Sequence, residues 1–130
     1  MAATISLTAG CAGVPAVPAA SARASAPVQQ QIAKDGGIPW DRTRPVRWAD
    51  FQGTPPDSGA EGAQTGYSLL YGVSCTCAAF DYDVSAVFLP SRSWVRALVL
   101  ADPDEARRTL RHEQTNFDIT EVHAGRLRKG

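Results

Sequence analysis

Two runs of alternating apolar and polar residues give the clearest structural signal in the chain. In the first run the apolar residues stand at odd positions from Tyr67 to Ala79, and in the second at even positions from Phe80 to Phe88. Alternation with period two is typical of a strand with one buried face. The change of phase between the runs requires a bulge or a turn. The pattern therefore predicts two or three antiparallel strands.

After Pro90 the spacing of the apolar residues becomes helical. A second, longer helix is expected to begin at Pro103, because Asp102 can cap its first turn and proline suits that position. Gly125 is expected to end this helix near Ala124. The shorter helix before it should include four apolar residues: Trp94, Val95, Leu98 and Val99.

Differences in composition divide the first half of the chain into segments. Residues 1–26 are rich in small residues and predict a signal or export segment, and residues 27–37 are polar, end in two glycines and predict a linker. The folded domain is then expected to span residues 38–130. Within it, residues 46–51 alternate and predict a short strand, and residues 53–66 are rich in glycine, proline and serine and predict a loop.

The N-terminal segment favours export to the periplasm or the extracellular space. Small residues around Arg23, in Ala22-Arg23-Ala24-Ser25-Ala26, provide candidate cleavage sites. No Lys or Arg precedes the apolar part, and Pro15 and Pro18 interrupt it, so a missed upstream start and a disordered tail are the alternatives. Cys11 follows Leu-Thr-Ala-Gly and is a candidate lipid-anchor site.

Composition and charge argue against some classes of function. The chain has 130 residues, room for one domain, with 13 basic and 13 acidic residues. This balance argues against nucleic-acid binding driven by net charge. No apolar run is long enough to predict a transmembrane helix. The elements together predict an α+β fold in which a small antiparallel sheet packs against a C-terminal helix pair.

Cys75 and Cys77 lie one residue apart in the expected strand, so their side chains point to the same face. Buried small side chains are the first interpretation, since a disulfide at this spacing would be strained. A disulfide and a metal site with further ligands remain open.

The long helix carries the candidate chemistry. Helical spacing places Glu113 between Leu110 and Phe117 on the apolar face, where a carboxylate must be paired, coordinated or protonated. His112 and Asn116 line the neighbouring flank. The zincin motif His-Glu-x-x-His uses histidines at this spacing to bind zinc and the glutamate to polarise the attacking water. Here asparagine, a poor zinc ligand, stands at the second position.

Four segments resemble the domain-of-unknown-function family numbered 922, described as predicted secreted zinc-dependent proteases. The similarity extends from near Trp40 to the C-terminus. The segments are Val46-Arg47-Trp48-Ala49-Asp50-Phe51-Gln52-Gly53, Ser93-Trp94-Val95-Arg96, Leu110-Arg111-His112-Glu113-Gln114 with Phe117-Asp118-Ile119-Thr120-Glu121, and Arg126-Leu127-Arg128-Lys129.

The resemblance implies a zincin-like long helix with His112 as a metal ligand, Glu113 as the general base, and zinc as the cofactor. Where the family usually has histidine this chain has Asn116, which implies a zinc-dependent peptidase that is impaired or inactive. The alternative is a non-catalytic binding or structural domain of the cell envelope. A peptide or protein is the expected substrate or partner; no nucleic acid is expected.

Other ligands for a metal are hard to supply from the same helix. His123 lies roughly 16 Å farther along it than His112. Glu121 could coordinate only if the helix were distorted, and Asp118 is expected to face solvent or a basic neighbour. The three tryptophans are expected to be core residues rather than substrate platforms.

Overall fold

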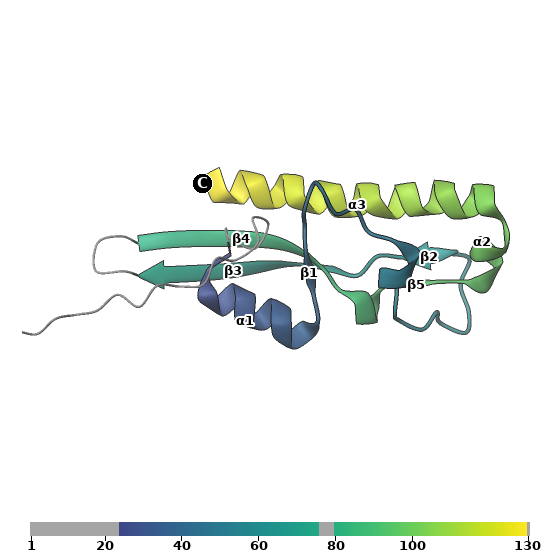
Figure 1. Ribbon diagram of the computed structural model, residues 1–130, viewed down its shortest axis with the longest axis horizontal. Helices are drawn as coiled ribbons and strands as arrows, with labels where there is room; N and C mark the ends of the chain where they lie inside the picture. The colour runs from purple at the N-terminus through teal and green to yellow at the C-terminus, as the bar shows by residue number, and fades with distance from the viewer. Residues whose placement is uncertain (1–23, 76–79, 130) are drawn as a thin grey trace, which may run out of the picture.

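A three-stranded antiparallel sheet lies between two helices in the computed structural model, which describes residues 24–75 and 80–129 (Figure 1). The strand order is β1-β4-β3, and the strands are β1 (Ile38–Pro39), β3 (Tyr67–Cys75) and β4 (Phe80–Phe88). Helix α3 (Pro103–Lys129) covers one face of the sheet and α1 (Ala26–Asp35) covers the other. The expected α+β class, with a small antiparallel sheet and a long C-terminal helix, is confirmed.

Shorter elements extend this framework beyond the sheet. They are the 3-10 helices η1 (Trp48–Asp50) and η2 (Pro90–Arg92), a small ladder of β2 (Ala63–Gln64) with β5 (Trp94–Val95), and the helix α2 (Ala97–Ala101), which contacts α3. No helix in the described part of the chain is both long and apolar enough to cross a membrane.

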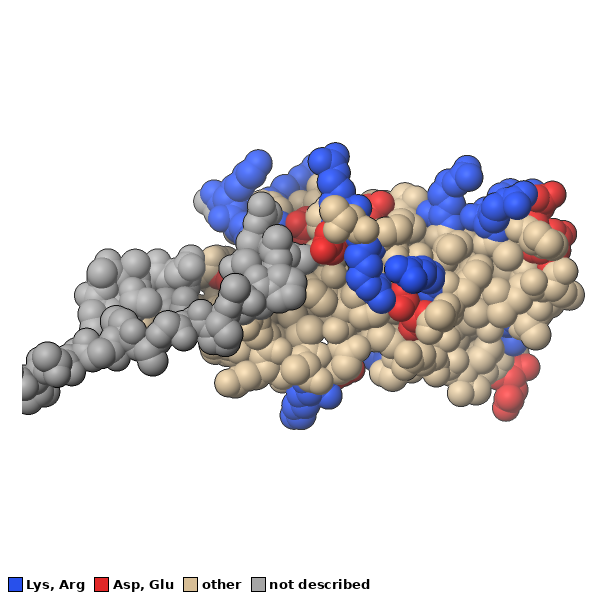
Figure 2. Space-filling view, viewed as in Figure 1, with Lys and Arg blue, Asp and Glu red and all other residues tan. Residues whose placement is uncertain are grey.

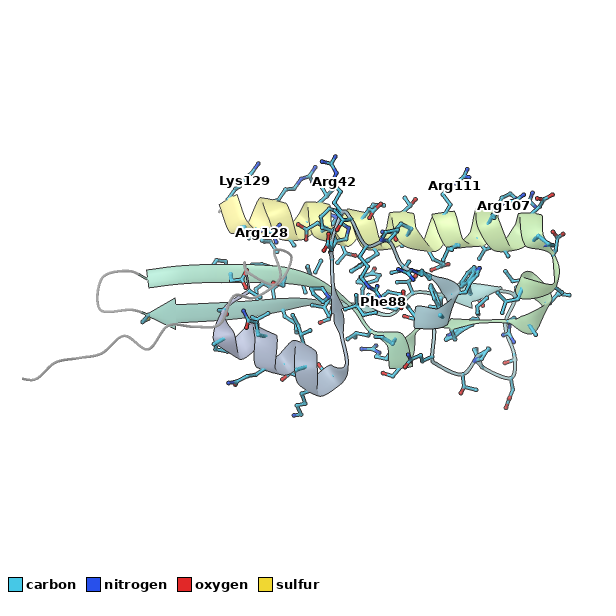
Figure 3. The ribbon with its side chains drawn as sticks, in the orientation of Figure 1. Arg42, Phe88, Arg107, Arg111, Arg128 and Lys129 are labelled. Carbon is cyan, nitrogen blue, oxygen red and sulfur yellow. The ribbon has the colours of Figure 1, made fainter. Side chains whose placement is uncertain are left out.

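Each face of the sheet has its own hydrophobic core, because neighbouring residues of β4 point to opposite faces. On the α3 side, Phe88 contacts Phe51 and Phe117 through their rings, and Figure 3 shows Phe88 between the layers. On the α1 side, Val28 and Ile32 pack with the β4 residue Val87 and its neighbours.

Strands β3 and β4 form the predicted antiparallel pair, with Tyr67 opposite Phe88 and Cys75 opposite Phe80. The reversal of direction between them accounts for the change of phase in the sequence. The side chains of β3 depart from expectation, because α3 contacts β4 far more than β3. Tyr71 is 58% exposed and Val73 is 49% exposed, so the odd-numbered face of β3 is only partly buried.

The prediction that Cys75 is a buried small side chain is wrong for the same reason. Cys75 is a free, exposed thiol rather than a buried small side chain. Cys77, like Cys11 and residues 1–23, lies outside the described residues.

Residues 27–37, expected to be a linker, instead form most of helix α1. Val28 and Ile32, four positions apart, place two apolar side chains on one helix face, which α1 buries against the sheet. Gly36 ends the helix in the left-handed conformation, with φ of 61°. The ordered part of the chain therefore begins before Ile38.

Two further expectations were wrong at the level of local structure. The segment 46–51 contains the 3-10 helix η1 rather than a strand, because the Asp50 carboxylate accepts hydrogen bonds from the backbone N–H of Arg47 and from the Arg44 guanidinium. Burial raises the pKa of Asp50, but these hydrogen bonds and charges lower it more, and it lies below its ordinary value. Trp94–Val95 pairs as β5, and the helix after it begins only at Ala97.

Helix α3 begins where the sequence predicts and ends later. Asp102 caps it by accepting hydrogen bonds from the backbone N–H groups of Asp104 and Glu105. Both hydrogen bonds lower the pKa of Asp102, and the bond from Glu105 has the larger effect. Gly125 does not end the helix, which continues to Lys129.

Candidate functional site

The candidate motif residues lie on different sides of α3. Glu113 is 5% exposed and faces the core, as predicted from its position between Leu110 and Phe117. His112 is exposed, and Asn116 is half-buried on the flank that faces β3. Successive helical positions are about 100° apart, so a neighbour of an exposed residue can point inward.

The carboxylate of Glu113 is held by a threonine from a distant part of the chain. Thr65 directly follows β2. Its hydroxyl donates a hydrogen bond of 2.5 Å to Glu113 Oε2, and both residues are buried. This length is typical of a hydroxyl that donates to a carboxylate. The glutamate is thus paired inside the protein and links α3 to the β2 region.

The next residues of the motif hold the chain that leads into η1. Gln114 accepts the backbone N–H of Val46 at 2.8 Å and donates to Asp118 at 2.7 Å. Asp118 also accepts the indole N–H of Trp40 at 2.9 Å. Asp118 therefore serves two neutral donors within the fold, instead of solvent or a basic neighbour.

The segment Ser93–Arg96 also has structural contacts. The Ser93 hydroxyl donates to the Leu89 carbonyl and accepts the Gly66 backbone N–H. The Arg96 guanidinium binds backbone carbonyls of the preceding loop, those of Pro56, Ser58 and Glu61. Of the tryptophans, Trp94 is buried, and Trp40 and Trp48 pack partly buried against the core, as expected.

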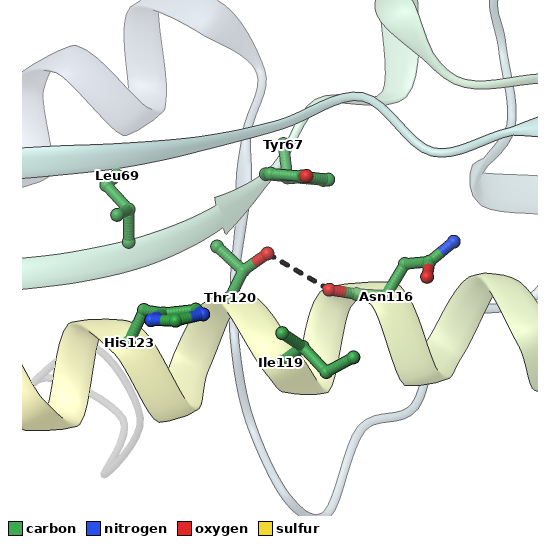
Figure 4. A pocket seen from close by; sticks show the side chains of 6 residues that line it. All are labelled: Tyr67, Leu69, Asn116, Ile119, Thr120 and His123. Atoms are coloured by element: carbon green, nitrogen blue, oxygen red, sulfur yellow. Dashed lines mark hydrogen bonds between the residues drawn. The ribbon is translucent and has the colours of Figure 1, made fainter.

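A shallow groove lies between β3 and the Asn116 flank of α3 (Figure 4). Tyr67 and Leu69 line it from the strand, and Asn116, Ile119, Thr120 and His123 line it from the helix. Its volume is about 220 Å³, below the usual 300–1,000 Å³ of small-molecule sites. The groove is therefore suited to a side chain of a larger partner rather than to a whole small molecule.

The outer side of α3 has a different character. Lys and Arg side chains gather along it in Figure 2, and Figure 3 shows Arg107, Arg111 and Lys129 directed away from the sheet. Arg107 pairs with Asp104 on the same helix. Arg107, Arg111 and Lys129 therefore lie on the opposite side of the helix from the sheet.

The residues around His112 do not fit a zincin centre. Zinc needs three protein ligands in a catalytic site, with the general base close to the bound water. Within residues 24–75 and 80–129, no cluster of three His, Cys, Asp or Glu side chains could hold a metal ion. Glu113 is paired with Thr65 in the interior, while His112 faces solvent.

The remaining candidates on α3 do not complete a metal site. Glu121 pairs with Arg128, whose guanidinium also donates to the Val84 carbonyl, so Arg128 is anchored to the sheet. His123 lines the groove, near its end away from His112. The sequence suggested neither the groove nor the roles of Gln114 and Asp118, although the spacing of that pair by four is typical of residues in contact on a helix.

The chain was compared with protein-family models, with curated proteins and with solved structures, and none of the three comparisons found a match.

Proposed function

We propose that this chain is an exported, non-catalytic binding domain, which holds an extended segment of a partner protein along the outer edge of β3. The proposal rests on one observation about that edge. Strand β3 is the last strand of the sheet, no described strand pairs with its outer side, and apolar side chains beside it are exposed. The export part of the proposal rests on the small-residue N-terminal segment.

The backbone of β3 is arranged to accept another strand. The Gly66 carbonyl accepts the backbone N–H of Leu89, which marks this pair as hydrogen-bonded. Because such pairs alternate in an antiparallel ladder, the odd-numbered residues from Tyr67 to Cys75 direct their N–H and C=O groups away from β4. Among the described residues no strand pairs with that side.

The side chains of the edge also favour pairing. Strand β3 contains no charged residue and no proline, the features that proteins use to block edge-to-edge pairing. Tyr71 and Val73 are about half exposed, and the groove beside Tyr67 can take one further side chain. Backbone hydrogen bonds would supply affinity, and contacts at alternate side chains would supply specificity.

These contacts define the chemistry of the partner. It is an extended segment with apolar or aromatic side chains at alternate positions, facing the α3 side of the sheet. A single strand fits better than a second copy of the chain. In a dimer with a two-fold axis perpendicular to the sheet, both α1 helices would lie on the same face of the joined sheets. That face is already occupied near the edge, because Ser25 at the start of α1 lies against Gly72 of β3.

The pairing of Glu113 supports the non-catalytic part of the proposal. A general base must reach the water or substrate that it activates. The Glu113 carboxylate faces the core and accepts the Thr65 hydroxyl. The motif residues Gln114 and Asp118 likewise have partners within the fold.

Panning of the purified chain against displayed random peptides tests the binding. We expect the enriched peptides to carry apolar residues at alternate positions. The Tyr71→Lys variant should lose the binding, because it places a charge in the middle of the edge. Val122→Lys is the matched control, since Val122 is 53% exposed on α3 and does not line the groove. Peptides without alternation, or equal loss in both variants, would contradict the proposal. A dimer that Tyr71→Lys dissociates would assign the edge to a second copy.

Zinc titration and a casein-cleavage assay test the non-catalytic part separately. The unmodified chain should show neither tight zinc binding nor zinc-dependent cleavage. The Asn116→His variant should gain weak zinc binding through two imidazoles spaced by four, but no cleavage, because Glu113 stays in the core. Tight stoichiometric zinc together with cleavage by the unmodified chain would favour the peptidase function instead.

A further inference from the structure

A buried carboxylate near the start of α1 has no cationic partner. Asp83 stands on the α1 side of β4 and is 5% exposed. It accepts hydrogen bonds from the backbone N–H of Ser25 at 2.9 Å and, at 3.4 Å, from the hydroxyl of Ser85. None of the ion pairs among the described residues includes it. A buried carboxylate is costly unless it is well paired, so a cation at this point would stabilise the fold.

The position of Ser25 against Asp83 is fixed by its surroundings. Its carbonyl accepts the backbone N–H of Gln29 in the first turn of α1. Its hydroxyl is buried without a hydrogen-bond partner in the described structure and lies so close to Gly72 that a Cβ atom there would be 1.8 Å away. Any charge placed on the Ser25 nitrogen would therefore meet the Asp83 carboxylate.

The sequence can place a charge on that nitrogen. Export peptidases cut after a small-x-small pattern, and residues 20–26, Ala-Ser-Ala-Arg-Ala-Ser-Ala, offer cuts after Ala22, Ala24 and Ala26. Of these, only the cut after Ala24 makes the Ser25 nitrogen a new N-terminus. The other two cuts place the new terminus at Arg23 or at Pro27.

We infer that the chain is processed between Ala24 and Ser25, and that the new N-terminal ammonium of Ser25 forms a buried ion pair with Asp83. Water hydrolyses the peptide bond, Ala24 keeps the carboxylate, and the Ser25 amine takes up a proton. An α-amino group has an ordinary pKa of about 7.7–8.0 and is charged at neutral pH beside a carboxylate. The pair then fastens the start of α1 to β4 (Figure 1). The inference rests on the export that forms part of the proposed function.

One electrostatic effect opposes this pair and gives the test its control. The ammonium lies at the N-terminal end of α1, where the helix dipole disfavours positive charge. The ion pair with Asp83 outweighs that effect only while the carboxylate is present. Removing the negative charge should therefore reverse the sign of the contribution of the ammonium.

The stability test compares the chain that starts at Ser25 with a free amine and the same chain with an acetylated amine. The acetyl group keeps one N–H donor on the nitrogen and replaces the Ala24 carbonyl, which accepts a hydrogen bond from the Gln29 side chain, but it removes the charge. The free amine lacks this acceptor in both backgrounds, so the difference between the backgrounds isolates the ion pair. We expect the free amine to lower the unfolding equilibrium constant by about five- to tenfold, because a hydrogen bond to an ionised donor is stronger than a neutral one. In the Asp83→Asn background the acetylated form should be the more stable one.

The same difference in stability between the two forms in both backgrounds would overturn the inference. If Asp83→Asn fails to fold, the first residue of the exported protein still decides where the chain is cut. Mass spectrometry of the protein recovered from an exporting bacterial host supplies the second measurement, and Ser25 is the expected first residue. A first residue of Arg23 or Pro27 would refute the cleavage site while leaving export intact. An intact Met1 on cytoplasmic protein would refute export as well, and with it that part of the proposed function.

Discussion

At the scale of single residues, polar groups inside the protein are paired with partners from distant parts of the chain. Thr65 and Glu113 are 48 positions apart, and Val46 and Gln114 are 68 apart. A polar group left unsatisfied in the interior costs roughly 1–3 kcal/mol, comparable to a sizeable part of the total stability. These pairs therefore stabilise the packing of α3 on the rest of the domain and specify its position.

The first prediction concerns the partner of Glu113. Thr65→Val keeps the shape of the side chain but removes the hydroxyl, so the buried carboxylate loses its donor. We expect a loss of roughly 1–3 kcal/mol in the free energy of unfolding, measured by urea denaturation. Thr65→Ser keeps a donor and should lose much less. Equal losses in the two variants would show that packing of the threonine methyl, rather than the hydrogen bond, is important.

The sequence predicted where Glu113 lies but not what it contacts. Helical periodicity is a local property, so it placed the carboxylate on the buried face correctly. The choice of Thr65 depends on how the region around β2 packs on α3, and no local pattern encodes that. For the same reason the motif spacing predicted a shared flank for His112 and Asn116 but could not supply a third ligand.

At the scale of elements, tertiary contacts extend α3 beyond the point where the sequence predicts its end. Glycine costs a helix about 1 kcal/mol relative to alanine. Beyond Gly125, Arg128 donates to the Val84 carbonyl and pairs with Glu121, and Ala124 is fully buried. These contacts outweigh the low helical propensity of glycine, which here lies within the helix rather than at its end.

Gly125→Ala tests this position directly. A Cβ atom added at Gly125 would meet only the Arg128 guanidinium, at 3.6 Å, an ordinary contact. We therefore expect a gain of about 0.5–1 kcal/mol in the free energy of unfolding. Gly36→Ala is the control and should destabilise, because Gly36 has a φ of 61°. A loss of stability in Gly125→Ala would indicate that the helix ends at this residue in solution.

Sequence patterns predicted the longer elements better than the short ones. The strands β3 and β4 and the start of α3 carry many residues of one period, so single exceptions have little effect. The segment 46–51 is too short for its alternation to outweigh the hydrogen bonds of Asp50. Residues 27–37 were predicted as a linker because they are polar, although Val28 and Ile32 already had helical spacing.

At the scale of the whole molecule, the sheet needs cover on both faces. Helix α3 covers the face that carries Val84, Ala86 and Phe88, and α1 covers the face that carries Val87. A sheet with both faces apolar is stable only as the middle layer of such an arrangement. No described strand continues the sheet along the outer edge of β3, where apolar side chains are exposed, which is why we assign partner binding to it.

The last prediction tests whether α1 belongs to the folded domain. A chain that starts at Ile38 lacks Val28 and Ile32, which are 2% and 8% exposed in the complete fold. Burial of the two side chains contributes roughly 3–6 kcal/mol, a large share of the 5–15 kcal/mol typical of a whole domain. Loss of α1 also exposes Val87 to water. We expect this chain to lose its near-ultraviolet circular dichroism and its cooperative urea transition. A chain that starts at Ala24 retains α1 and should unfold at the same urea concentration as the complete chain. If the chain from Ile38 unfolds cooperatively with an unchanged midpoint, residues 24–37 are dispensable, and α1 is an appendage rather than the second cover of the sheet.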